Sequence, residues 1–205
     1  MDKNYWNNYY SKNNKLQDPT SFAKSVINII PDNSKIMELG CGTGRDSYYF
    51  ASKGHILTAC DQSEIIIKNL LQKNKNNPYF LKSDIKNLSK KINDRFNIIY
   101  ARFVLHALDD MESKEAISWT FSHLEKDGLF LSESRSIQDS IFGSGDKVNN
   151  RIYKTTHQRR FLKKDELLKD LKNAGFIIDD VVENKGLAIY KDSDPVVIRI
   201  VARKP

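Results

Sequence analysis

The sequence predicts one α/β domain, in which a mostly parallel, twisted sheet of seven strands carries helices on both faces. Short β-rich apolar runs alternate along the chain with longer amphipathic stretches, the pattern expected when parallel strands are joined by crossover helices. The chain has 205 residues, of which 40% are hydrophobic and 29% are charged. This length and composition fit a single globular domain and exclude wholesale disorder or a membrane bundle.

The first expected helix follows an aromatic and polar opening segment, residues 5–15. Thr20, directly after Pro19, is typical of a helix cap, so a helix is expected over residues 22–30. Pro31 is expected to end this helix, because proline cannot continue the helical hydrogen-bond pattern.

Seven apolar runs bounded by turn residues are predicted strands, and the amphipathic stretches between them are predicted helices. Gly54 and Gly175 are expected to end two of these helices at the C′ position. A turn at Asp127-Gly128 precedes the fifth strand, and the final helix and two strands imply an antiparallel hairpin whose C-terminal strand lies at one edge of the sheet. The expected strands are 35–39, 55–60, 79–82, 97–101, 129–134, 176–183 and 196–202, and the expected helices after the first are 44–52, 64–72, 111–124 and 162–174.

Charge and cysteine usage limit the function classes. The net charge of +7 permits a nucleic acid or a small anionic molecule as partner, although abundant Lys and Asn explain it equally well as a compositional bias. Cys41 and Cys60 have no metal-ligand spacing, so neither a metal nor a disulfide is expected. No apolar run is long enough to span a bilayer. The start, residues 1–6 (MDKNYW), lacks the basic and then apolar layout of a secretion signal, so a cytoplasmic location is expected.

The most informative segment, residues 38–46, reads ELGCGTGRD and lies where the first strand turns into a helix. Glycines at such a turn permit a sharp bend and let a ligand pack against the backbone. Asp61 ends the second strand 17 residues after Gly44, near the interval at which an acid reaches a ribose diol in nucleotide-binding βαβ units. Asp84 follows the third strand.

This segment resembles the first motif of the class I S-adenosylmethionine-dependent methyltransferases, which is an acidic residue, any residue, and then Gly-x-Gly-x-Gly. Glu38, Gly40, Gly42 and Gly44 match that motif without gaps. The strand order, with its C-terminal helix and hairpin, is also similar to this Rossmann-like family, so the resemblance covers nearly the whole chain. It implies S-adenosyl-L-methionine as cofactor and S-adenosyl-L-homocysteine as product.

The resemblance also implies roles for individual residues. The glycine loop takes the methionine part of the cofactor, and Asp61 takes the ribose hydroxyls. Asp84 and Ile85 take the adenine, and Arg102 lines the same pocket after the fourth strand. The expected cofactor-binding residues are Trp6, Tyr10, Glu38, Gly40, Cys41, Gly42, Gly44, Arg45, Asp46, Asp61, Gln62, Asp84, Ile85 and Arg102.

Trp6 and Tyr10 are expected either to cover the cofactor, through stacking and cation–π contact, or to pack an N-terminal helix on the sheet. The single domain is expected to have four parts, the first of which contains this lid. They are 1–30 for the N-terminal lid and helices, 35–135 for the cofactor-binding core, 136–161 for an irregular acceptor-binding loop, and 162–205 for the C-terminal helix and edge hairpin.

The rival interpretation of the glycine loop is a nicotinamide or flavin dehydrogenase, whose fingerprint is Gly-x-Gly-x-x-Gly. Arg45 occupies the position of the third glycine in that fingerprint. A mere packing turn with solvated acids does not explain why Glu38, Asp61 and Asp84 each lie at a strand end. S-adenosylmethionine is therefore the expected ligand.

The residues after the fourth strand indicate the class of methyl acceptor. Residues 101–106 read ARFVLH, without the Asn or Asp, two prolines and aromatic that are usual in methylases of DNA amino groups or of glutamine. This departure favours the small-molecule branch of the family. A nucleic-acid enzyme would also be expected to show a recognition domain or stacked aromatics beside a basic stripe, so nucleic acid is not the expected partner.

The basic stretch 136–161 predicts an anionic acceptor, because arginine binds carboxylate or phosphate through two parallel hydrogen bonds. Arg135 ends a central strand, at the edge where ligands of open α/β sheets bind. The alternative is that these arginines are solvated or ion-paired, and Arg199 in the last strand is assigned a structural role. The expected substrate-binding residues are Arg135, Tyr153, His157, Arg159 and Arg160.

His106 and His157 are the two candidates for a catalytic base, which a hydroxyl acceptor would need and a carboxylate or phosphate oxygen would not. The alternative for His106 is a packed histidine, given its apolar neighbours. Segments 133–136, 157–161, 186–188 and 194–199 resemble a branch associated with surface-polysaccharide or phospho-headgroup synthesis.

The predicted function is methyl transfer from S-adenosylmethionine to a small, anionic metabolite or sugar, phosphorylated or carboxylated. Two alternatives remain. One is an RNA methyltransferase that uses the basic residues 147–164 as a phosphate-contacting patch. The other is a non-catalytic protein that binds S-adenosylmethionine.

Overall fold

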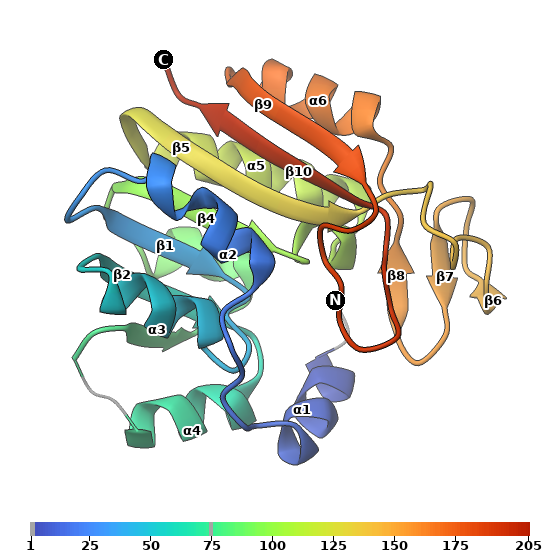
Figure 1. Cartoon of the computed structure of the whole chain (residues 1–205), viewed down its shortest axis with the longest axis horizontal. Helices are drawn as coiled ribbons and strands as arrows, with labels where there is room; N and C mark the ends of the chain where they lie inside the picture. Colours follow the sequence, from blue (N-terminus) through green and yellow to red (C-terminus); the bar gives the residue numbers. More distant parts are fainter. Residues whose placement is uncertain (1–2, 74–75) are drawn as a thin grey trace.

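Seven strands form one sheet, in the order β3-β2-β1-β4-β5-β10-β9, in the computed structural model, which describes residues 3–73 and 76–205 (Figure 1). β1 pairs in parallel with β2 and β4, β2 with β3, and β4 with β5. The predicted fold class is therefore confirmed, including the antiparallel C-terminal strand. The strands are β1 (Lys35–Leu39), β2 (Ile56–Asp61), β3 (Tyr79–Lys82), β4 (Phe96–Arg102), β5 (Leu124–Arg135), β9 (Ile177–Asn184) and β10 (Val197–Arg203).

The place of the antiparallel strand differs from the expectation of an edge position. β10 is inserted between β5 and β9, so the edge strand on this side is β9. Burial explains the order: β10 alternates buried and half-buried residues, whereas β9 alternates exposed and half-buried ones. The more apolar strand of the hairpin therefore takes the position with neighbours on both sides.

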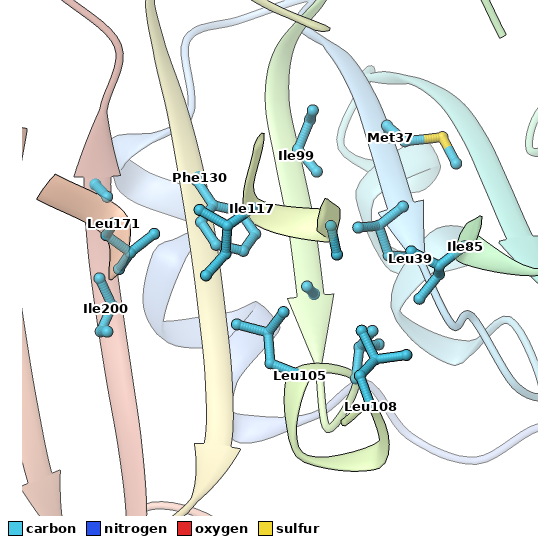
Figure 2. Packing of buried hydrophobic residues seen from close by; sticks show 14 of the residues in the cluster. Met37, Leu39, Ile85, Ile99, Leu105, Leu108, Ile117, Phe130, Leu171 and Ile200 are labelled. Atoms are coloured by element: carbon cyan, nitrogen blue, oxygen red, sulfur yellow. The ribbon is translucent and has the colours of Figure 1, made fainter. Parts of the chain in front are cut away.

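Helices cover both faces of the sheet. Phe22 of α2 and Phe50 of α3 pack with Tyr100 on one face, where α4 adds Ile66 and Leu70. On the other face, α5 and α6 pack against β4, β5 and β10, as seen around Ile117, Phe130 and Leu171 in Figure 2. The helices are α1 (Lys3–Lys12), α2 (Ser21–Val26), α3 (Arg45–Ser52), α4 (Glu64–Lys73), α5 (Asp110–His123) and α6 (Lys164–Asn173), with the 3-10 helices η1 (Ile27–Ile29), η2 (Ile85–Lys90) and η3 (Leu105–Ala107).

Local capping sets several of these helix boundaries. The Thr20 hydroxyl accepts a hydrogen bond from the Ala23 backbone N–H at 3.1 Å, so Thr20 is the N-cap of α2, as predicted. Asp109 and Glu112 form a capping box at the start of α5. Gly175 has φ +105° after α6, which matches its predicted place beyond the helix end.

The expected turn at Asp127-Gly128 is instead an irregularity within a longer β5, which begins at Leu124. Asp127 has φ +60°, and the register between β4 and β5 shifts at this point. Lys204 donates a backbone hydrogen bond to the Gly128 carbonyl at 3.0 Å and so keeps this part paired. Tertiary pairing has overridden the local turn preference.

The stretch predicted to be irregular, 136–161, contains a second, three-stranded antiparallel sheet, so that expectation was wrong. Its strands are too short to show a hydrophobic period, and side-chain packing holds them together. The rings of Phe142, Tyr153 and Phe161 form one cluster, with centroids 5.3 to 6.3 Å apart. The strands are β6 (Asp146–Lys147), β7 (Ile152–Lys154) and β8 (Gln158–Arg160).

Within residues 3–73 and 76–205, none of the helices combines the length and apolar character needed to cross a membrane. Of the six residues on which the expectation about a secretion signal rests, Met1 and Asp2 lie outside the described residues.

Candidate active site

A cavity of about 970 Å³ lies at the C-terminal ends of β1, β2, β4 and β5. Ligands of open α/β sheets bind at this edge. The cavity is roofed by α1 and the segment that follows it, residues 13–21, and its far wall comes from β8 and from the β9–β10 loop. Of the predicted site residues, those that line the cavity are Trp6, Tyr10, Glu38, Gly40, Cys41, Gly42, Arg45, Asp46, Asp61, Gln62, Ile85, Arg102, Arg135, His157 and Arg159.

The glycine loop between β1 and α3 forms the floor of the cavity. Gly40 and Gly42 have φ +69° and +52°, which side chains rarely adopt. A Cβ on Gly40 would lie 2.7 Å from Cγ2 of Val104, and one on Gly42 would lie 2.6 Å from the Tyr10 hydroxyl. Gly44 begins α3 and faces the core behind the loop. Two of the three motif glycines therefore expose bare backbone to the cavity.

Asp61 stands beside this loop at the end of β2. Its Oδ2 accepts from the Gly42 backbone N–H at 3.0 Å and its Oδ1 from the Ser63 N–H at 2.8 Å. Burial raises the pKa of the Asp61 carboxyl, and these backbone donors oppose the increase. Each oxygen keeps a second lone pair, so the carboxylate can accept further hydrogen bonds.

Two more acids lie under the loop. The Glu38 carboxylate is buried and accepts from the Ser47 hydroxyl, and burial, followed by the nearby Asp46, raises its pKa well above the usual range. Asp46 accepts from the Thr20 N–H and hydroxyl, both at 2.8 Å, and from the Tyr100 hydroxyl at 2.9 Å. Asp46 therefore fastens the start of α2 to the loop. Burial also raises the pKa of the Cys41 thiol, which stays neutral.

The side chain of Gln62, next to Asp61, is buried, and its Nε2 has no hydrogen-bond partner within the described part of the chain. An unpaired buried amide is costly, so this donor is available to a ligand. Ile85 lies on the same side of the cavity. Asp84 does not line it: the carboxylate accepts from the Lys86 N–H at 3.2 Å, caps η2, and faces a smaller separate pocket.

Helix α1 covers the cavity with aromatic side chains. Trp6 stacks near Tyr10, with centroids 5.8 Å apart, and the Tyr10 hydroxyl lies over Gly42. The Tyr5 and Trp6 rings lie 4.5 and 5.2 Å from the His157 ring, in the segment before β8. Helix α1 therefore bridges the glycine loop and the basic wall of the cavity.

Three arginines form that basic wall. Arg102 donates from Nε to Oε1 of Glu133 at 2.8 Å, and Arg135 donates from Nη1 to Oδ2 of Asp139 at 2.5 Å. Arg159 donates to the Thr155 hydroxyl at 2.5 Å. Burial, followed by the charge of Arg135, lowers the pKa of the Arg159 guanidinium.

Two predicted substrate-binding residues lie outside the cavity. Tyr153 packs with Phe142 in the cluster of the small sheet. Arg160 pairs with Asp110 and donates to the Leu105 carbonyl at 3.0 Å, so it fastens β8 to η3 and to the start of α5.

His106 also lies beside the cavity rather than in its lining. Its Nδ1 accepts from the Arg135 backbone N–H at 3.2 Å, which places the proton of the neutral ring on Nε2. Burial, with the charges of Arg135 and Arg159, holds the pKa of His106 well below its usual range. In this position the ring supports the backbone of Arg135.

Part of the site escaped the sequence reasoning. Residues 13–21 and the loop between β9 and β10 both line the cavity, the latter through Ala188, Ile189, Tyr190, Ser193 and Pro195. The Gln17 side chain accepts from Arg45 at 2.9 Å and donates to the Tyr190 hydroxyl at 3.3 Å. The Asp194-Pro195 turn marks the loop in the sequence, but no local signal brings it to the glycine loop.

Comparisons with known proteins bear on this geometry. Residues 36–128 match the family model described as a methyltransferase domain. Residues 36–128 therefore form a methyltransferase domain, and the sheet that contains it has the fold of class I methyltransferase structures. The matched residues run from β1 into β5 and include the glycine loop and Asp61. No curated protein matches the sequence.

Solved structures share the fold of the methyltransferase at low sequence identity. The 1,6-didemethyltoxoflavin-N1-methyltransferase of Burkholderia thailandensis, solved with S-adenosylhomocysteine, is 20% identical, with a TM-score of 0.70 over 89% of this chain and 76% of that one. An S-adenosylmethionine-dependent methyltransferase of Clostridium acetobutylicum is 18% identical, with a TM-score of 0.68 over 99% and 92%. The [4+2]-cyclase SpnF is 18% identical, with a TM-score of 0.69 over 89% and 79%.

The Burkholderia structure holds S-adenosylhomocysteine, and the cavity of this chain has groups that fit such a ligand. Gly40 and Gly42 line the cavity, and a Cβ at either position would collide with the side chain of Val104 or Tyr10. The Asp61 carboxylate and the unpaired Gln62 amide offer an acceptor and a donor on the adjoining wall.

Replacing Gly42 with alanine is expected to weaken binding of S-adenosylhomocysteine at least tenfold, because the new Cβ would displace the Tyr10 side chain, which covers the cavity. Gly54→Ala is the matched control. Gly54 also has a positive φ, of +90°, but nothing lies within 4 Å of its Cβ position. Calorimetric titration of each variant measures the affinity for S-adenosylhomocysteine, and a thermal melt measures the stability lost to strained backbone. Equal loss of affinity in both variants would show that strained backbone, not the cavity floor, is responsible.

Proposed function

We propose that this protein transfers a methyl group from S-adenosylmethionine to a small anionic acceptor, a phosphorylated or carboxylated metabolite or sugar. The observation that carries this proposal is the division of the cavity into two ends. Glu38, Asp46 and Asp61 stand beside the glycine loop on the side of β1 and β2, and Arg102, Arg135 and Arg159 line the cavity on the side of β4, β5 and β8. An anion is the ligand that such an arginine-lined wall binds.

In this proposal the acidic end holds the cofactor. The methionine part lies on the glycine loop, with Glu38, Cys41 and Arg45 around it, and the ribose hydroxyls donate to Asp61. Gln62 and Ile85 flank the adenine, and Trp6 and Tyr10 cover the adenosyl group. Asp84 acts indirectly, since its cap on η2 positions Ile85.

S-adenosylmethionine supplies a methyl group on a sulfonium, and the neutral thioether that remains is a good leaving group. Positioning of the acceptor therefore dominates catalysis. Arg102, Arg135 and Arg159 hold the anionic part of the acceptor, and His106 positions Arg135 through its backbone bond. His157 lines the cavity and takes the proton of a hydroxyl acceptor. A carboxylate or phosphate oxygen as acceptor needs no such proton transfer.

The RNA alternative receives less support from the described contacts of the basic segment. Arg151 pairs with Asp110 and Glu166, and Arg160 pairs with Asp110, so these cations are already neutralised. The Burkholderia neighbour is named for a small molecule, which agrees with the small-molecule proposal. The proposed reaction belongs to surface-polysaccharide or headgroup synthesis and takes place in the cytoplasm. The chain acts as one domain in this proposal.

The proposal is tested by incubating the protein with S-adenosylmethionine and a panel of phosphorylated, carboxylated and neutral metabolites, and measuring S-adenosylhomocysteine. We expect product only with anionic members of the panel. Turnover restricted to neutral acceptors would contradict the proposal. Binding of the cofactor with no turnover for any acceptor class would favour the non-catalytic alternative.

Arg159→Ala should lower kcat/KM for the anionic acceptor about 10- to 100-fold, because it removes a charge-assisted hydrogen bond. Cofactor affinity should stay unchanged. Lys147→Ala is the matched control, since Lys147 belongs to the same basic segment but is exposed on β6, away from the cavity. If Lys147→Ala reduced turnover as much as Arg159→Ala, the extended basic patch of the RNA alternative would be favoured instead.

A further inference from the structure

We infer that the group anchored at the basic wall is a dianionic phosphate monoester. This inference rests on the proposed function and narrows its acceptor class. It stands on the balance of charges around Glu133 and Asp139, on the burial of these charges, and on the number of guanidinium groups that face the cavity.

One buried carboxylate serves two arginines at this wall. Glu133, at the end of β5, is fully buried, and it accepts from Arg102 through Oε1 at 2.8 Å and from Arg199 through Oε2 at 2.7 Å. The side chains of Arg102 and Arg199 are only 17% and 11% exposed. The trio therefore carries one uncompensated positive charge with little access to water.

Arg199 is directed away from the cavity, because three of its four remaining N–H donors are occupied elsewhere. Its Nη2 donates to the Leu187 carbonyl at 2.5 Å and to the Ser21 hydroxyl at 3.0 Å, and its Nη1 donates to the Ser25 hydroxyl at 3.3 Å. Arg199 does not line the cavity, whereas Arg102 does. The surplus charge of the trio is thus presented to the cavity by Arg102.

Arg159 adds a second surplus positive charge, because the neighbouring Arg135 is already paired with a carboxylate. Asp139 is buried and forms an ion pair with Arg135 at 2.5 Å. Among residues 3–73 and 76–205, no carboxylate forms an ion pair with Arg159, whose Nη1 donates to a threonine hydroxyl. Arg102 and Arg135 both approach the Phe103 ring, with Cζ 4.1 and 5.9 Å from its centroid, and Arg159 lines the same cavity. Four arginines and two carboxylates leave two positive charges at the wall.

Uncompensated charges in a largely buried site are costly, and a ligand of opposite charge removes that cost. A phosphate monoester supplies close to two negative charges at neutral pH and three terminal oxygens, one for each of the arginines that line the cavity. A carboxylate supplies one charge and two oxygens. The monoester therefore matches both the surplus charge and the number of guanidinium groups.

The test is a calorimetric titration of the full chain, saturated with S-adenosylhomocysteine, with methyl phosphate, dimethyl phosphate and acetate. We expect methyl phosphate to bind at least tenfold more tightly than dimethyl phosphate or acetate. Arg159→Ala should lose this preference, and Lys147→Ala should keep it. Dimethyl phosphate or acetate binding as tightly as methyl phosphate would overturn the inference and leave an anionic acceptor standing. Failure of S-adenosylhomocysteine to bind would overturn the proposed function itself.

A pH series sharpens the test. The second pKa of a phosphate monoester is about 6, so between pH 7.5 and pH 5 its affinity should fall about tenfold. Sulfate, a dianion at both values, is the control for titration of the protein. The groups that face this end of the cavity are Arg102 on β4, Arg135 on β5, His157 and Arg159 at β8, and Tyr5 on α1, with Asp139 behind Arg135. An equal fall for sulfate would assign the effect to the protein rather than to the ligand and count against a dianionic phosphate.

Discussion

Glu133→Gln should lower the free energy of unfolding by about 3–5 kcal/mol, the cost of leaving buried charges without their partner. The Glu133 carboxylate is fully buried and is shared by Arg102 and Arg199. A glutamine of the same size can accept through only one oxygen and carries no charge. The variant would therefore leave two buried guanidinium groups without any counter-charge.

Urea unfolding, followed by circular dichroism, measures this loss. Glu64→Gln is the matched control, because it removes the same charge from an exposed ion pair with Lys82 and should leave the midpoint nearly unchanged. Binding of a phosphate monoester should be altered in Glu133→Gln as well, since Arg102 loses its positioning partner. A stability equal to that of the wild type would show that Glu133 does not neutralise the two arginines.

Asp61→Ala should weaken binding of S-adenosylhomocysteine by about 100-fold, with the fold retained. A hydrogen bond to a charged group contributes about 1.5–3 kcal/mol, and each 1.4 kcal/mol is a factor of ten in affinity. Asp61 also orders the loop through its bond to the Gly42 N–H, so Asp61→Asn, which keeps one acceptor oxygen, should lose less than the alanine variant.

Asp84→Ala is the control for this prediction. Asp84 also follows a strand, but it caps η2 outside the main cavity, so its replacement should cost about 1 kcal/mol of stability and little cofactor affinity. Calorimetric titration of the three variants measures the difference. Equal losses for Asp61→Ala and Asp84→Ala would return Asp84 to direct contact with the cofactor.

The order of strands and helices could be predicted because most elements carry a clear local signal. β1 and β3 have the predicted bounds, and the caps at Thr20 and Gly175 lie where the sequence placed them. The position of β10 could not be predicted from the pattern along one strand, because it depends on which of two hairpin strands is better buried between neighbours.

The residues of the candidate site could be predicted only in part. The glycine motif identified the loop, because close approach to backbone at Gly40 and Gly42 requires residues without side chains. The acids and arginines of the cavity follow strand ends, which topology brings to one edge. Asp84, Tyr153 and Arg160 lie outside the cavity for reasons that only tertiary contacts reveal, namely a helix cap, a ring cluster and an ion pair with Asp110.

The contribution of the β9–β10 loop also depends on distant contacts. Arg199 holds the Leu187 carbonyl and so brings this loop over the cavity. In the sequence, Arg199 is a single charged residue in an apolar strand, and its partner Glu133 is 66 residues away. Such pairing leaves no local pattern.

Calorimetric titration of the purified protein with S-adenosylmethionine and S-adenosylhomocysteine, followed by methyl phosphate, tests the central claim most directly. The structure leads us to expect saturable binding of both cofactor forms at one site, and binding of methyl phosphate that is tighter once the cofactor product is present. The absence of any binding of S-adenosylmethionine and S-adenosylhomocysteine would contradict the assignment of the glycine loop, and with it the account of both ends of the cavity.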